Sequence, residues 1–158
     1  MPRKFVVVAV LELLVGAVIV FYAPTFTLPG RQLAGSVKDF PVSETPYAVM
    51  DGERVAYFLV NMSGEWLAFV PAETNPNVDC PVRWDERRQI FSGPCLGTRY
   101  RLTGEWCDGP AVRNLDQYPV EINNDRVWVH TDYVIAGEAT AVYKAANGNR
   151  SPGCPIPP

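Results

Sequence analysis

The chain has 158 residues, a formal net charge of −3 and hydrophobic residues at 47% of its positions. This length accommodates one domain and a membrane anchor, and the weak acidic charge gives no support for nucleic-acid binding, which normally requires a basic surface. The 15 prolines and 12 glycines favour a loop-rich, mainly β domain over a helical bundle.

The N-terminal region contains a long apolar run, Phe5 to Tyr22, that only Glu12 interrupts. As a helix, the 18 residues of this run would extend about 27 Å, close to the thickness of the hydrocarbon core of a bilayer. Arg3 and Lys4 precede it, which predicts a cytoplasmic N-terminus and a domain on the extracytoplasmic, periplasmic side. A cleaved signal peptide is the alternative, but its apolar core is usually shorter and no clear cleavage site follows. We expect an uncleaved, single-pass membrane anchor.

Glu12 is an ionisable residue within the predicted span. Facing lipid, it would cost on the order of 2–3 kcal/mol, so one interpretation is a contact with another membrane subunit. The other interpretation is a tolerated acid near one end of the span. After the anchor at 1–23, residues 24–35 contain Pro24, Pro29 and Gly30. We expect this segment to be a short linker whose prolines restrict the movement of the domain that follows.

Residues 36–150 are predicted to form one domain of short antiparallel strands, followed by a Pro-rich tail at 151–158. Two predicted hairpins have polar turns, at 61–64 and at 123–125, between runs of β-branched and aromatic residues. The predicted strands are Arg54–Val60, Glu65–Val70, Arg88–Phe91, Glu121–Ile122, Val127–Val129 and a final edge strand at Thr140–Tyr143. His130 directly follows the predicted strand Val127–Val129 and is interpreted as a surface residue at the strand end rather than a ligand.

The four cysteines of the chain indicate disulfides, because the domain is expected outside the cytoplasm. Three pairings are possible. The chain has no Cys-x-x-Cys motif and no neighbouring His that would activate a thiol, so reactive thiols are the weaker interpretation. Two of the cysteines stand in short turn-rich segments, Asn75-Pro76-Asn77-Val78-Asp79-Cys80 and Gly93-Pro94-Cys95-Leu96-Gly97-Thr98.

These two segments resemble the cluster-binding loops of Rieske iron–sulfur proteins, the [2Fe–2S] subunits of quinol–cytochrome oxidoreductases. In that family the loops read Cys-x-His-x-x-Cys and Cys-x-Cys-His-Gly-Ser. The first Cys and the His of each loop bind iron, and the other two Cys form a disulfide. The resemblance extends over residues 36–135 through Val37–Pro41, Gly64–Phe69, Tyr100, Gly104, Gly109-Pro110-Ala111 and Leu115.

The resemblance implies a mainly β fold, a Rieske-like antiparallel β-sandwich domain behind one N-terminal transmembrane helix. It also implies two disulfides, Cys80–Cys95 and, from the remaining cysteines, Cys107–Cys154. The four positions that match the iron ligands of the family hold Asn75, Asn77, Gly93 and Leu96. We therefore expect no [2Fe–2S] cluster and no other metal cofactor.

A different alignment, with Cys80 and Cys95 as the iron ligands, does not restore the ligand set. It places Val82 and Thr98 where the family has His. The chain has one His, His130, whereas a Rieske centre takes two imidazole ligands.

The resemblance, the anchor and the missing ligands together predict a non-catalytic accessory subunit that structurally supports a membrane electron-transfer complex, respiratory or photosynthetic. Its partners would be other subunits of that complex, contacted through the transmembrane helix and the head domain. The apolar loop tip at Leu96 would either pack on a partner or turn inward. Two alternatives remain open: an extracytoplasmic binding or thiol-redox module, and an electron carrier with an unusual metal centre.

Overall fold

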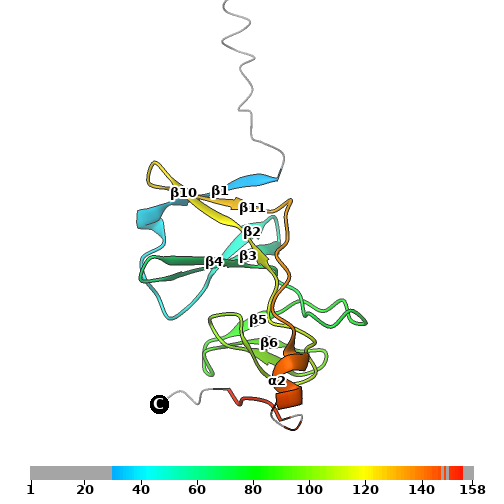
Figure 1. The fold of residues 1–158 in the computed structure, drawn as a ribbon. Helices are drawn as coiled ribbons and strands as arrows, with labels where there is room; N and C mark the ends of the chain where they lie inside the picture. The colour runs from blue at the N-terminus through cyan, green and yellow to red at the C-terminus, as the bar shows by residue number, and fades with distance from the viewer. Residues whose placement is uncertain (1–29, 147, 149, 155–158) are drawn as a thin grey trace, which may run out of the picture.

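A computed structural model describes residues 30–146, 148 and 150–154 of the chain. The fold of these residues is mainly β, as predicted, with strands arranged in three antiparallel sheets (Figure 1). The predicted anchor, including Glu12, lies outside the described residues. Within the described part of the chain, no helix is long and apolar enough to cross a membrane.

The three sheets are stacked as layers, and the second lies between the first and the third (Figure 1). The first sheet has the order β1 (Arg31–Ser36), β11 (Arg126–His130) and β10 (Val120–Asn123). The second has the order β2 (Tyr47–Asp51), β3 (Arg54–Met62), β4 (Glu65–Phe69) and β9 (Gln117–Tyr118). The third has the order β5 (Arg83–Asp85), β6 (Ile90–Gly93), β7 (Thr98–Tyr100) and β8 (Trp106–Asp108). A short 3-10 helix, η1 (Val37–Asp39), and the helix α2 (Thr140–Ala146) complete the described elements.

Both predicted hairpins are present, and each is closed by a two-residue turn. Met62 of β3 pairs with Glu65 of β4 across Ser63 and Gly64, whose φ angles are 54° and 99°. Asn124 and Asp125, with φ angles of 50° and 58°, join β10 to β11 in the same way. Left-handed backbone at both turn positions matches the twist of the flanking strands, and Asn, Asp and Gly adopt it most readily.

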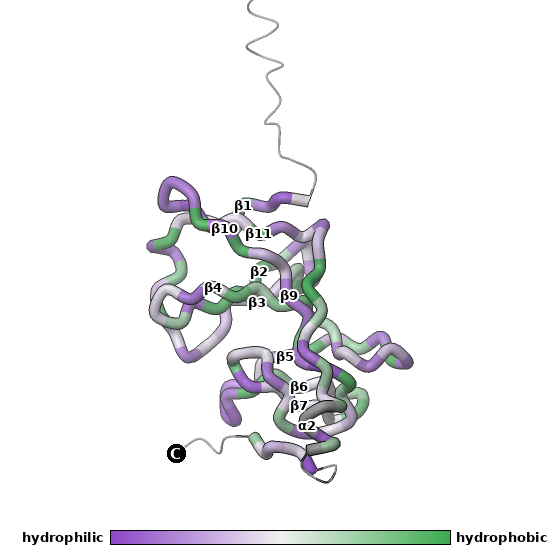
Figure 2. Tube along the Cα trace, in the orientation of Figure 1, coloured by the Kyte–Doolittle hydropathy of each residue, from purple (hydrophilic) through white to green (hydrophobic). Residues whose placement is uncertain are grey.

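Strand β3 is buried on both faces, which explains its continuous apolar sequence. Tyr57 and Leu59 face the first sheet and pack with Val127 and Val129 of β11. The intervening residues Phe58 and Val60 face the third sheet, in a second core cluster that also contains Phe69, Val82, Phe91, Tyr100, Trp106, Ala111 and Leu115. The hydrophobic colour along β3 and β4 in Figure 2 follows this central layer. The predicted sandwich is thus the first two sheets, and the third sheet is packed onto its outer side.

Two sequence predictions at the ends of the domain are wrong. Residues Thr140–Tyr143, predicted as an edge strand, begin helix α2. This segment is anchored through Ala111, because the Thr140 hydroxyl donates to the Ala111 carbonyl at 2.9 Å and the Lys144 ammonium donates to the same oxygen at 2.8 Å. At the other end, β1 begins at Arg31 and pairs with β11, so the last part of the predicted linker at 24–35 belongs to the domain.

Candidate functional site

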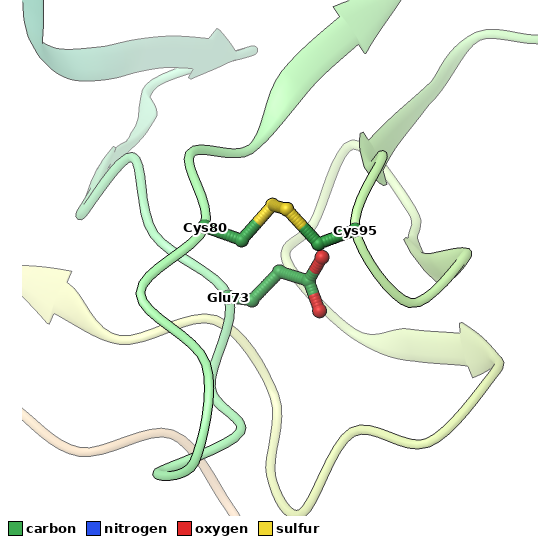
Figure 3. A group of neighbouring side chains, drawn as sticks. All are labelled: Glu73, Cys80 and Cys95. Carbon is green, nitrogen blue, oxygen red and sulfur yellow. A yellow bond between two sulfur atoms is a disulfide. The ribbon is translucent and has the colours of Figure 1, made fainter.

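The two loops singled out from the sequence lie side by side at the third sheet (Figure 3). The first loop connects β4 to β5 and contains Cys80, and the second connects β6 to β7 and contains Cys95. The two cysteines form a disulfide with a Cα–Cα distance of 6.2 Å. Cys80 is fully buried, whereas Cys95 is exposed. This bond joins a buried residue of the first loop to an exposed residue of the second.

The second disulfide joins Cys107 of β8 to Cys154 in the tail. The Gly153 N–H donates to the Cys107 carbonyl at 3.1 Å, and the Arg101 guanidinium donates to the Gly153 carbonyl at 3.1 Å. Both pairings implied by the family resemblance are therefore present.

The four positions that match iron ligands have different environments. Asn75 shapes the tip of the first loop, because its side-chain oxygen accepts the Asn77 N–H at 3.0 Å and its carbonyl accepts the Val78 N–H at 3.2 Å. Asn77 is exposed. Gly93 is buried at the end of β6. Leu96 is 41% exposed, so of the two orientations considered for the apolar tip, the outward one is observed.

A buried carboxylate, Glu73, lies between the loops beside the disulfide (Figure 3). The residue is only 7% exposed. Its Oε2 accepts a hydrogen bond from the fully buried Thr98 hydroxyl at 3.0 Å. Its Oε1 is buried with no hydrogen-bond partner among the described residues. Its backbone N–H donates to the Cys80 carbonyl at 2.9 Å, which fixes the residue on the first loop. The sequence interpretation did not include this residue.

Glu73 occupies the space that a side chain at position 93 would need. A Cβ atom built on Gly93 would overlap the Glu73 carboxyl group and its Cγ atom. Position 93 matches the first Cys of the second loop in the Rieske family. The Glu73 carboxylate therefore lies where a ligand side chain would leave the backbone of the second loop.

A hydrogen-bonded network behind the first loop holds Glu73 and its neighbour Thr74 in place. The Thr74 hydroxyl donates to the Arg113 carbonyl at 2.7 Å and lies 3.0 Å from the Tyr100 hydroxyl oxygen, which also accepts the Thr74 N–H at 3.3 Å. Because the Thr74 proton is directed at Arg113, Tyr100 donates to Thr74. Burial raises the pKa of Tyr100, so its hydroxyl remains protonated for this bond.

Arg113 and Asp116 form the other end of this network. The Arg113 Nε and Nη2 atoms donate to the two Asp116 oxygens at 2.7 Å each, and the Gly137 N–H donates to Asp116 Oδ1 at 3.0 Å. Burial acts to raise the pKa of Asp116, but the hydrogen bonds from Arg113 and Gly137 outweigh it and lower that pKa below its ordinary value. The ion pair thus fixes the segment around Arg113, whose carbonyl accepts the hydrogen bond from the Thr74 hydroxyl.

Asp116→Asn is expected to lower the free energy of unfolding at pH 7 by about 1–2 kcal/mol, because it weakens charge-assisted hydrogen bonds. A folded-state pKa below the unfolded value stabilises above the unfolded pKa, and this stabilisation is lost as the pH falls through the folded pKa. The difference between wild type and variant should therefore shrink below about pH 4. Urea unfolding at pH 7 and pH 3 measures it. An equal difference at both pH values would contradict the electrostatic origin.

His130 lies apart from these loops, in the first sheet. Its Nε2 atom is 3.1 Å from Glu121 Oε2, and its side chain is 33% exposed. The position at the end of β11 agrees with the surface residue predicted.

No protein-family model matches the chain. It is 32% identical over 81 residues to the cytochrome b6-f complex iron-sulfur subunit of Prochlorococcus marinus subsp. pastoris, over 49% of this chain and 46% of that protein. It is 28% identical over 93 residues to the subunit of the same name from Chlorobaculum thiosulfatiphilum, over 59% of this chain and 49% of that protein. The chain spans about half the length of the curated relatives it matches.

Among solved structures, the cyanobacterial plasma membrane Rieske protein PetC3 from Synechocystis PCC 6803 aligns with a TM-score of 0.48 and 24% identity, covering 62% of this chain and 97% of that chain.

The antiparallel sheets and the disulfide-linked pair of loops define a Rieske-like domain. The sequence matches support the resemblance of the loops to the Rieske iron–sulfur proteins. The residues at its loops do not fit a Rieske cluster. Such a cluster takes two thiolates and two imidazoles, but the matching positions offer no sulfur and no imidazole, and the two loop cysteines are bonded to each other.

Proposed function

We propose that this protein is a membrane-anchored, cluster-free Rieske-like accessory subunit that structurally supports a membrane electron-transfer complex, respiratory or photosynthetic. The curated relatives are named as iron–sulfur subunits of the cytochrome b6-f complex, which supports a place in a complex of this kind. The single observation that carries the proposal is the replacement of the second-loop ligand position by Gly93, with the Glu73 carboxyl lying over it.

The loops keep their shape by means other than a metal. The Cys80–Cys95 bond, with a sequence separation of 15, contributes about 3 kcal/mol in the chain-entropy model. The Glu73–Thr98 hydrogen bond joins the first loop to β7, and the Thr74–Tyr100 pair makes a second link between the same elements. A domain that is rigid without a cluster is suited to a structural role, and none of these contacts supplies an electron carrier.

The proposed subunit has two contact surfaces for the complex. The predicted N-terminal helix, with Glu12 facing another membrane subunit, would hold the chain in a single-pass orientation with its N-terminus in the cytoplasm. The head, on the periplasmic side, presents the exposed Leu96 at the tip of the second loop. A non-catalytic role follows, in which binding to neighbouring subunits is the whole function.

Purification from membranes in mild detergent tests this proposal. The full chain is expected to copurify with larger membrane subunits in a fixed ratio, without iron or acid-labile sulfide in proportion to it and without a [2Fe–2S] EPR signal after reduction. Stoichiometric iron and sulfide in the purified chain would contradict the proposal and favour an electron carrier. A chain that purifies alone under conditions that keep a known complex intact would argue against the accessory role.

A second candidate function, a thiol-redox module, is favoured by one observation. Cys95, one of the two residues of the loop disulfide, is exposed, which places this disulfide near solvent and external thiols. Substitution of this disulfide, described in the Discussion, separates the two functions.

A further inference from the structure

Glu73 has an oxygen that the fold leaves unsatisfied. Its Oε2 is held by Thr98, but its Oε1 is buried and has no hydrogen-bond partner among the described residues. Leaving a buried acceptor without a partner costs about 1–3 kcal/mol. An atom of this kind beside two sulfurs is suited to a positively charged partner.

The unsatisfied carboxylate and the two loop sulfurs form a compact group. Ligand atoms of Glu73, Cys80 and Cys95 all lie within 4.8 Å of one another. Tetrahedral zinc with Zn–S bonds of about 2.3 Å and Zn–O bonds of about 2.0 Å places its ligand atoms about 3.5–3.8 Å apart. The sulfurs are closer than this while they are bonded, and they need only side-chain rotation to separate, because their Cα atoms are already 6.2 Å apart.

We infer that reduction of the Cys80–Cys95 disulfide creates a mononuclear site for a divalent cation, Zn²⁺, with the two thiolates and the Glu73 carboxylate as its three protein ligands. The fourth position is open to water. This inference goes beyond the structural role proposed above and does not depend on the host complex.

The reaction balances with an external dithiol as reductant. The dithiol gives two electrons and two protons and becomes a disulfide, while the Cys80–Cys95 bond breaks to give two thiols. Binding of Zn²⁺ then releases both thiol protons and forms two Zn–S bonds. Two thiolates and one carboxylate carry three negative charges, and the cation offsets two of them.

The chemistry of these three ligands favours zinc over a hard cation. Thiolates select zinc and other soft or borderline ions, whereas Ca²⁺ and Mg²⁺ require mainly oxygen ligands. The Thr98 hydroxyl fixes the carboxylate by binding its other oxygen, a contact that orients a metal ligand without using its free lone pairs. The exposed Cys95 provides the route by which reductant and cation enter.

Zinc titration of the full chain tests the inference, in a background with Cys107→Ser and Cys154→Ser so that the loop pair is the only source of thiols. The oxidised chain is compared with the chain reduced by a phosphine and then freed of reductant without air. We expect one Zn²⁺ per reduced chain and none per oxidised chain. With Co²⁺ as the probe, a thiolate-to-metal charge-transfer band should appear in the reduced chain alone.

Glu73→Gln and Glu53→Gln form the matched pair of variants, since Glu53 is exposed in the turn between β2 and β3. Glu73→Gln should weaken Zn²⁺ binding at least tenfold, and Glu53→Gln should leave it unchanged. Near-UV circular dichroism reports whether each reduced chain stays folded. Absence of binding, or binding that is the same in both variants, whether the chain is folded or not, would overturn the assignment.

Discussion

Gly93→Ala is expected to lower the free energy of unfolding by about 2–3 kcal/mol, within the range seen when extra atoms are forced into a packed core. The reason is steric, because a Cβ at this position overlaps the carboxyl group of Glu73. The backbone of Gly93 is not left-handed, so alanine brings no conformational strain of its own. Urea unfolding of the purified protein, followed by circular dichroism, measures the loss.

A double-mutant cycle identifies Glu73 as the cause. Glu73→Ala alone removes the Thr98 hydrogen bond and leaves a cavity, and it should be destabilising by itself. In the Glu73→Ala background, Gly93→Ala should cost less than about 1 kcal/mol, since the overlapping group is gone. The same cost in both backgrounds would show that the two residues do not compete for space. It would also remove the main support for the proposal that Glu73 has taken the place of a ligand side chain.

The features that could be predicted from the sequence are those for which the local residue types favour the same structure as the surrounding fold. The two hairpins were found because Asn, Ser, Asp and Gly stand where the backbone is left-handed, at 63–64 and 124–125. The disulfides followed from the resemblance between the loops and a known family. These features are coded by residues adjacent in the sequence or by spacings characteristic of a family, and both are visible without coordinates.

The wrong strand prediction and the missed residue both concern positions whose structure is determined by contacts between residues far apart in the sequence. Thr140–Tyr143 has a strand-like composition, but contacts with Ala111 anchor it as the start of a helix. Glu73 was missed because nothing in its neighbourhood distinguishes it from a surface acid. Its burial depends on two distant residues. Thr98, 25 residues away, hydrogen-bonds its carboxylate, and Gly93 leaves the space that the carboxyl group fills. A glycine in a ligand position was the one available signal, since it leaves space that another side chain must fill.

Replacing both loop cysteines by alanine is expected to lower the free energy of unfolding by about 3 kcal/mol in the chain-entropy model, for the observed sequence separation of 15. The Cys107–Cys154 bond closes a longer segment, with a separation of 47, and its removal should cost about 4 kcal/mol in the same model. Thermal and urea unfolding of the two double variants, each beside wild type, test these values and their order.

The same two variants separate a scaffold from a thiol-redox module. If the protein is a scaffold, each variant that is folded at low temperature should still copurify with its membrane subunits. Any loss of copurification should then follow the loss of stability alone. A redox module requires the exposed Cys95, so Cys80→Ala with Cys95→Ala would abolish its activity while the more destabilised Cys107→Ala with Cys154→Ala variant retained it. That reversal of the stability order would favour redox chemistry, because the loop disulfide contains the exposed residue Cys95, whereas Cys107 is buried and Cys154 is half-buried.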